Sequence, residues 1–247
     1  MHHMRRKLKS IIGLALTATI LGACSTQSTK YLDADAIAAL DNLTATMGEL
    51  ESCSFTLQTT EISIESGSPE VSFKKTDAYL NGPSQMYFYT ENDKGRRGVW
   101  YNQTELSVFM FDDNTFQTIA VPERLMQVID SLNGNFKMEF PAADFFYPSL
   151  TDDVIQNSDS VFLLENKTID GVDHLQVMAL NGKNEVYIII DSETYLPKQL
   201  EIYCKGEKLG ESYISTFSNW RVNPNLPESL FQFSPGDADE AKIINKN

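Results

Sequence analysis

The side chains that most often carry catalysis are few in this sequence. Beyond residue 3 the chain contains one histidine, His174, which lies in a strand-like pattern with the apolar residues Leu175 and Val177. A serine hydrolase needs its histidine beside an exposed serine, and the sequence has no Gly-x-Ser-x-Gly turn. We therefore expect His174 to be a hydrogen-bonded strand residue in a non-enzymatic protein, with a hydrolase as the remote alternative.

Two pairs of acidic residues have the chemistry of metal ligands or proton carriers. Asp112-Asp113 lies in a turn-like run, and Asp152-Asp153 lies at the start of a short helical pattern. Turn formation and helix capping explain both pairs. The sequence also has no Cys-x-x-Cys motif. We predict neither a metal site nor a cofactor.

The N-terminus has the pattern of an export signal. Basic residues at 5–9 precede an apolar stretch, Ile11–Leu21, of about half the roughly 20 residues that a membrane-spanning helix needs. The sequence Leu21-Gly22-Ala23-Cys24 resembles the lipobox of bacterial lipoproteins. That resemblance implies cleavage between Ala23 and Cys24 and attachment of acyl chains such as palmitate to Cys24. An ordinary signal peptide is the alternative.

The position after the cysteine bears on the destination of the protein. Ser25 stands there instead of the aspartate that retains enterobacterial lipoproteins at the inner membrane. The resemblance thus implies a lipid anchor in the outer membrane, with the folded domain facing the periplasm. Residues 24–31 are then a short lipidated tether.

Two further cysteines, Cys53 and Cys204, remain in the chain after cleavage. Cys53 alternates with Phe55 and Leu57, and Cys204 alternates with apolar residues in the same way, so both should face the core. An oxidising compartment allows them to form a disulfide. Two buried free thiols are the alternative.

The charge of the chain restricts its partners. Four of the 20 basic residues and none of the 34 acidic residues precede Cys24, so residues 24–247 have a formal net charge of −18. Nucleic-acid binding depends largely on neutralising phosphates, so nucleic acid is excluded. Binding of anionic headgroups through a basic surface is disfavoured as well.

Hydrophobic periodicity predicts a mainly β fold of the α+β class. A helix is expected from Asp33 or Asp35 to Leu50 because apolar residues recur there every three or four positions. Strands follow, then a helical insertion at about 122–157, then more strands. We assign residues 32–235 to a single domain and residues 236–247 to a polar tail. The expected strands are 55–64, 71–81, 85–90, 98–102, 105–111, 115–121, 160–169, 172–180, 185–191, 199–205 and 211–220.

Aromatic residues fall on neighbouring predicted strands and in the helical insertion. They either pack in the core or line a cavity for an acyl chain or another apolar ligand. Phe145 and Phe146, in the insertion, would suit a movable lid over such a cavity. The candidate lining residues are Tyr87, Tyr89, Trp100, Phe109, Phe111, Phe145 and Phe146.

One basic cluster stands out in the acidic chain. Lys94-Gly95-Arg96-Arg97 occupies an expected hairpin turn. It is interpreted as a solvated turn, with contact to a partner as the alternative.

Several segments together resemble a known protein family. They are the opening helix leading into Ser54-Phe55, the runs Trp100–Leu106 and Pro141–Phe146, Gly171–Leu175, and Tyr195–Lys198 leading into a strand. These resemble the predicted periplasmic proteins of domain-of-unknown-function family 2092, which is similar in fold to the lipoprotein carriers LolA and LolB and to the regulator RseB. The resemblance implies a curved antiparallel half-barrel of about 10–11 strands with helices covering its concave face.

The expected function follows from the anchor and the fold. We predict an outer-membrane-anchored, periplasm-facing monomer that contacts the membrane through Cys24. It binds a lipid, an acyl chain or a lipidated protein without catalysis. The alternative is a protein-interaction or envelope-stress module with partner contacts at the sheet edges or the 94–97 turn.

Overall fold

The computed structural model describes residues 30–65, 67–121, 123–135 and 142–244 of the 247-residue chain. The predicted cleavage and lipid-attachment residues, Ala23 and Cys24, lie outside these ranges. In the described ranges no helix is both long enough and apolar enough to cross a membrane.

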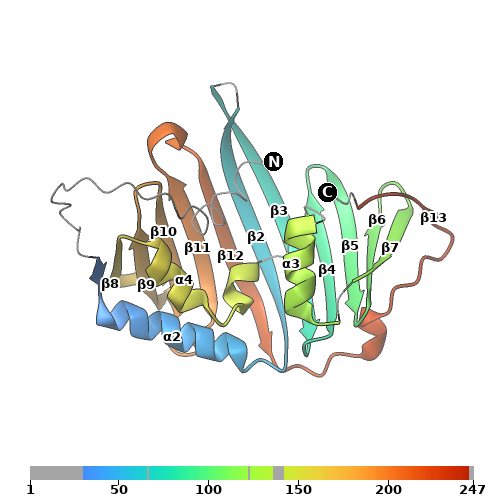
Figure 1. The fold of residues 1–247 in the computed structure, drawn as a ribbon, viewed down its shortest axis with the longest axis horizontal. Coiled ribbons are helices and arrows are strands. Elements are labelled where there is room, and N and C mark those ends of the chain that lie inside the picture. Colours follow the sequence, from blue (N-terminus) through green and yellow to red (C-terminus); the bar gives the residue numbers. More distant parts are fainter. Residues whose placement is uncertain (1–29, 66, 122, 136–141, 245–247) are drawn as a thin grey trace, which may run out of the picture.

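The described residues form one curved sheet of 13 strands (Figure 1). Its spatial order is β1-β8-β9-β10-β11-β12-β2-β3-β4-β5-β6-β7-β13. The strands are Tyr31–Leu32 (β1), Ser52–Glu65 (β2), Ser68–Asn81 (β3), Gln85–Asn92 (β4), Gly95–Asn102 (β5), Glu105–Met110 (β6), Thr115–Ala120 (β7), Ser160–Ile169 (β8), Val172–Leu180 (β9), Asn184–Asp191 (β10), Pro197–Cys204 (β11), Ser212–Val222 (β12) and Asp239–Glu240 (β13).

Eleven of these strands make two antiparallel meanders. Strands β2 to β7 pair in chain order, and so do β8 to β12. The pairing of β12 with β2 joins the two meanders. Tight turns make the sequential pairing possible, as at Asp170-Gly171, where both residues have positive φ angles of 54° and 78°.

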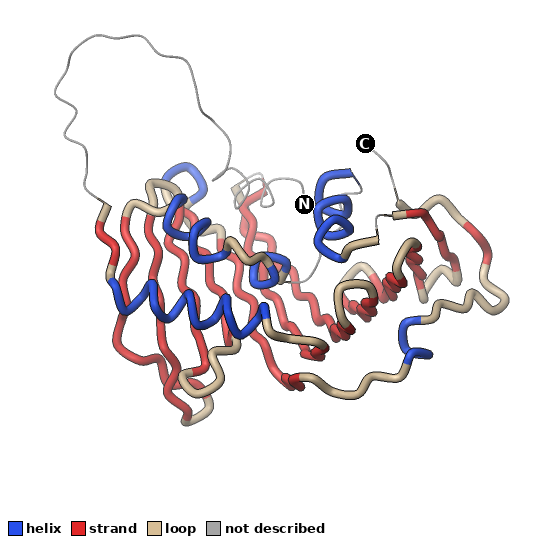
Figure 2. Tube along the Cα trace, turned by 60° about the horizontal axis from the view of Figure 1, so that its bottom comes forward, coloured by secondary structure: helices blue, strands red, loops and turns tan. Residues whose placement is uncertain are grey.

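Helices cover one face of the sheet (Figure 1). They are α2 (Ala34–Gly48), α3 (Leu125–Asn135), the 3-10 helix η1 (Ala143–Phe146) and α4 (Leu150–Asn157). Helix α2 begins at Asp33, whose side chain accepts a hydrogen bond of 2.9 Å from the backbone N–H of Asp35. Figure 2 shows these helices on the concave side, which we call the inner face; the other side is the outer face.

The core lies between the inner face and the helices. Over β8 and β9, helix α2 buries Leu40 and Leu43 completely and packs against α4 and η1. Phe145 of η1 meets Phe217 of β12 edge to face at 5.4 Å between ring centroids. Both aromatic rings are almost fully buried, so the insertion is part of the core.

The C-terminal segment wraps around the β7 edge of the sheet. After β12 it forms the 3-10 helix η3 (Glu228–Phe231), which contacts β4 and β5, and then β13, which pairs with β7 in parallel. The Gln117 side-chain oxygen accepts hydrogen bonds from the backbone N–H groups of Ile243 and Ile244, at 2.7 and 2.6 Å. Ile244 is buried in the core, so the packed domain continues beyond residue 235.

The predicted curved, mainly β half-barrel with helices on its concave side is confirmed. All eleven expected strands are present. The two additional strands, β1 and β13, have two residues each, which is too short to produce a periodic pattern.

Candidate binding surfaces

The inner face of β3 to β6 is an apolar surface built by strand register. Phe88, Val99 and Val108 are direct cross-strand neighbours and form one apolar row with Ala78. Side chains two residues further along each strand share the same face. They form a second row of Leu80, Met86, Tyr101 and Leu106, and both rows are buried.

Helix α3 packs against this surface. Its residues Leu125, Val128 and Ile129 are buried and belong to the same hydrophobic cluster as Phe88 and Val99. The helix is held at its start by the N–H of Leu125, which donates a hydrogen bond of 2.8 Å to the Pro83 carbonyl oxygen. Among the described residues, the apolar rows therefore pack against one short helix, α3, whose position over the sheet Figure 1 shows.

A polar row borders the apolar rows toward the β4–β5 hairpin. Thr76, Thr90 and Arg97 are successive cross-strand neighbours on the inner face, and Met110 of β6 follows them. The Thr76 and Thr90 hydroxyl oxygens lie 3.1 Å apart and form a buried hydrogen bond. The inner face thus changes from apolar to polar along the strands.

Arg97 is the charged member of that row. Its Nε is buried and has no hydrogen-bond partner among the described residues. Loss of contact with water lowers the pKa of its guanidinium. Burial of an unpaired polar group costs about 1–3 kcal/mol, and more for a charged group, so Arg97 sits at an energetic cost to the fold.

The neighbouring Arg96 differs because it points to the other side of the strand. Its Nε and Nη2 donate to Asp112 Oδ1 at 2.9 and 2.7 Å, and its backbone N–H donates to Asp112 Oδ2 at 2.7 Å. These hydrogen bonds hold the pKa of Asp112 below its usual value. The 94–97 turn therefore does not present two free arginines: Arg96 is ion-paired, and Arg97 belongs to the inner face.

The outer face of β3 to β7 carries an aromatic strip. The Tyr87 ring stacks on Tyr79 at 5.8 Å and on Trp100 at 4.7 Å. The Trp100 ring lies across Gly98, where a Cβ atom would come within 2.3 Å of ring carbons, so this packing requires glycine. Other members of the strip are Tyr89, Phe109, Phe111 and Phe116.

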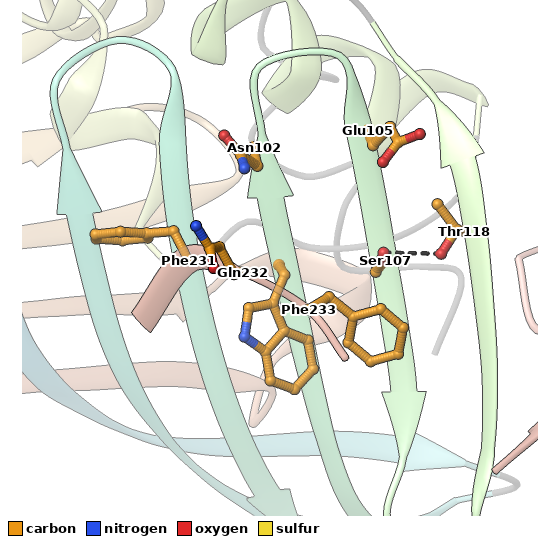
Figure 3. A pocket seen from close by; sticks show the side chains of 8 residues that line it. Asn102, Glu105, Ser107, Thr118, Phe231, Gln232 and Phe233 are labelled. Carbon is orange, nitrogen blue, oxygen red and sulfur yellow. Dashed lines mark hydrogen bonds between the residues drawn. The ribbon is translucent and has the colours of Figure 1, made fainter. Parts of the chain in front are cut away.

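The C-terminal segment lies on this strip and forms a pocket with it (Figure 3). Phe233 contacts Trp100, Phe109 and Phe116 at ring distances of 5.2, 6.1 and 5.5 Å. The pocket has a volume of about 430 Å³. It is lined by Trp100, Asn102, Glu105, Ser107, Thr118, Phe231, Gln232 and Phe233.

The seven aromatic residues predicted to line one cavity lie on two faces. Phe145 and Phe146 are on the inner face, where Phe146 stacks on Phe55 at 6.2 Å. The five residues on β4 to β6 and the following turn, Tyr87, Tyr89, Trp100, Phe109 and Phe111, are on the outer face. Alternation correctly grouped them, but a single strand gives no sign of which of its faces meets the helices.

The residue that sequence reasoning missed is Arg97. Its position in a basic run at a hairpin suggested a solvated side chain. The available signal was alternation, because Arg97, Val99 and Tyr101 are spaced by two and share one face of β5.

The possible disulfide between Cys53 and Cys204 is not formed, and both cysteines are buried. Strand β12 separates their two strands in the sheet. Cys53 pairs with one end of β12, whereas Cys204 lies near its other end, which pairs with Ile62. Nine residues of β2 span about 30 Å, far beyond the roughly 7 Å between Cα atoms that a disulfide allows.

His174 has the structural role that its strand pattern predicted. It is buried on β9, and its Nδ1 lies 2.9 Å from the Val172 carbonyl oxygen. The Asp191 carboxylate is its acidic neighbour, at 4.0 Å from Nε2. Within the described ranges, no group of three or more His, Cys, Asp or Glu residues could hold a metal ion.

One family model covers most of the chain. Residues 36–244 match the model described as a predicted periplasmic protein, DUF2092. No curated protein sequence matches the chain.

Solved structures of similar arrangement share little sequence with the chain. LprF from Mycobacterium bovis is 11% identical, with 79% of this chain and 97% of LprF covered and a TM-score of 0.48. The MucA/MucB complex from Pseudomonas aeruginosa gives 11% identity, coverage of 81% and 62%, and a TM-score of 0.43. A LolA superfamily protein from Nitrosomonas europaea gives 12% identity, coverage of 80% and 97%, and a TM-score of 0.34. At these values the likenesses carry no inference about function.

Proposed function

This chain belongs to the DUF2092 family of predicted periplasmic proteins, and from this premise we propose that it is a non-enzymatic lipoprotein of the cell envelope. In this proposal acyl chains on Cys24 anchor it in the outer membrane. Its domain faces the periplasm and binds a hydrophobic ligand, such as an acyl chain or the lipid part of a lipidated protein, between the inner face and helix α3.

The apolar inner face of β3 to β6 is the observation that supports ligand binding. Two complete rows of apolar side chains lie beneath one short helix. Enclosed apolar surfaces with a few polar groups at their border are typical of small-molecule sites. An acyl chain that replaced the contacts of Val128 and Ile129 would keep these rows out of water.

Photo-crosslinking tests this site directly. A fatty acid with a diazirine on its chain is added to the chain from Ser25 to Asn247, which retains every described residue. We expect crosslinks to inner-face residues such as Met86, Val99 and Val128. Crosslinks confined to the outer-face residues Trp100 and Phe109 would reject the inner face as the site.

The anchor is tested separately in cells. Incorporation of labelled palmitate and recovery in the outer-membrane fraction should both be lost in Cys24→Ala. A Cys53→Ala variant is the matched control and should keep both properties. Palmitate labelling that persists in Cys24→Ala would overturn the anchor.

A protein-interaction role is the second candidate, and the outer-face pocket favours it. The chain's own C-terminal segment already lies there with Phe233 against Trp100, which supports binding of a partner segment that bears an aromatic residue. In a pull-down from envelope extract, Trp100→Ala should then lose a partner that Arg96→Glu retains. Equal capture by both variants would remove this pocket as the contact.

A further inference from the structure

Arg97 is a half-buried side chain whose guanidinium Nε is buried without a hydrogen-bond partner among the described residues. Within the described chain its Nε has no hydrogen-bond acceptor and no carboxylate forms an ion pair with it. A buried polar atom without a partner is destabilising, and its presence in a native fold calls for an explanation such as a functional role. The missing partner is therefore expected to come from outside the chain.

The position of Arg97 indicates what kind of partner this is. Val99 and Tyr101 follow it on the same face of β5, so the apolar rows extend for about 13 Å along the strand from the guanidinium. Across the sheet the rows run over four strands, which is about 14 Å. One cation thus stands at one end of an enclosed apolar patch, with the Thr76 and Thr90 hydroxyls beside it.

We propose that Arg97 binds the anionic head of an amphiphilic ligand, a carboxylate or a phosphate, whose apolar chain lies on the inner face. This inference rests on the proposed function, because it names the class of hydrophobic ligand that the same site takes. The planar guanidinium donates two parallel hydrogen bonds to either anion. Inside the protein such a charged contact is stronger than it is in water.

The strongly acidic chain is compatible with this ligand. A net charge of −18 after cleavage disfavours a basic surface that collects anionic headgroups. Arg97 needs no such surface, because its Nε is buried and the contact is made at short range. A partly buried contact is also screened by salt less than an exposed one.

Three amphiphiles with the same sixteen-carbon chain test the proposal. Palmitate, hexadecyl phosphate and hexadecanol are titrated, below the concentrations at which they aggregate, into the chain from Ser25 to Asn247. We expect the better anion to bind about tenfold or more tightly than hexadecanol. The tighter of the two anions identifies the head as a carboxylate or a phosphate.

Variants at two adjacent arginines then test whether Arg97 causes the preference for an anionic head over hexadecanol. Arg97→Met should lose the preference for the anion and keep its affinity for hexadecanol. Arg97→Lys should keep part of the preference for the anion, because lysine retains the positive charge but cannot form the bidentate hydrogen bonds of a guanidinium. Arg96→Met is the matched control and should bind like the unaltered chain, because Arg96 is engaged with Asp112.

The outcomes separate this inference from the proposed function. If hexadecanol and both anions bind equally, or if Arg97→Met keeps the preference, the headgroup role of Arg97 is overturned while ligand binding stands. If none of the three amphiphiles binds, the proposed function fails as well. A folded Arg97→Met that is less stable than the unaltered chain would assign Arg97 a structural role and reject the proposal.

Discussion

At the scale of single residues, Arg97 lowers the stability of the ligand-free domain because its buried Nε has no partner among the described residues. It also lies at the border of the apolar rows on the inner face. Arg96 follows the opposite pattern, with its charge satisfied by Asp112 on the outer side. The two side chains are adjacent in sequence and alternate across the sheet, so Arg97 is half-buried on the inner face and Arg96 is exposed on the outer face.

Substitution of Arg97 by methionine is predicted to stabilise the ligand-free domain. Methionine removes the unsatisfied charge and keeps most of the side-chain volume, so the free energy of unfolding should rise by about 1–3 kcal/mol. Urea denaturation measures the change. Arg96→Met should change the free energy of unfolding much less, because its ion pair with Asp112 is exposed.

The two buried thiols give a prediction about alkaline pH. Burial raises the pKa of the Cys53 thiol to about 12, whereas an unfolded cysteine ionises near about 8.5. The folded state therefore favours the protonated thiol, and the stability that this thiol contributes is present below pH 8.5 and lost between about pH 8.5 and 12. Cys53→Ala should weaken this loss in urea denaturation.

Thiol titration complements that measurement. Iodoacetamide should label neither Cys53 nor Cys204 in the folded domain at pH 8, because both thiols are buried, and should label both after denaturation without a reductant. Labelling that required prior reduction would show that the two cysteines are joined by a disulfide.

At the scale of elements, sequence periodicity predicted the strands and helices well because each long element repeats its apolar positions. Which face of a strand meets the helices depends on partners distant in sequence. The sequence therefore predicted Trp100 beside the inner-face phenylalanines of one cavity and Arg97 in a solvated turn, whereas Trp100 lies on the outer face and Arg97 on the inner face. Their inner and outer positions follow from register with β4 and β6. The ends of the sheet were missed for a different reason: β1 and β13 have two residues each.

Substitution of one phenylalanine on each face should change the free energy of unfolding by different amounts. Phe145 is buried against Phe217, so Phe145→Ala should cost about 3–5 kcal/mol of unfolding free energy. Phe109 is half-buried on the outer face, and Phe109→Ala should cost about 1 kcal/mol. Equal losses in urea denaturation would contradict the assignment of faces.

The C-terminal segment is predicted to contribute to stability and to protect an edge. Ile244→Ala should cost about 2–4 kcal/mol, whereas Lys242→Ala, at an exposed position, should cost less than about 0.5 kcal/mol. A chain ending at Ala238 also loses β13 and leaves the β7 edge unpaired. Size-exclusion chromatography should then detect self-association through that edge.

At the scale of the whole molecule, a short strand from near each end of the described chain forms an edge of the sheet. Strand β1 pairs with β8 at one end and β13 pairs with β7 at the other, both in parallel. Between them the inner face divides into a part under α2, α4 and η1 and a part under α3. The proposed ligand lies in the second part, where the cover is thinner.

The junction of the two meanders has a consequence for how the protein forms. Hairpins within each meander close over short loops, whereas β2 and β12 lie about 150 residues apart in sequence. Loop closure of that length makes their pairing a slow, late event. Until it occurs, β2 and β12 each have one unpaired edge, and each edge can pair with another molecule. The step most open to misassembly is thus the meeting of β2 and β12, so a newly exported chain would need protection there until the two halves join.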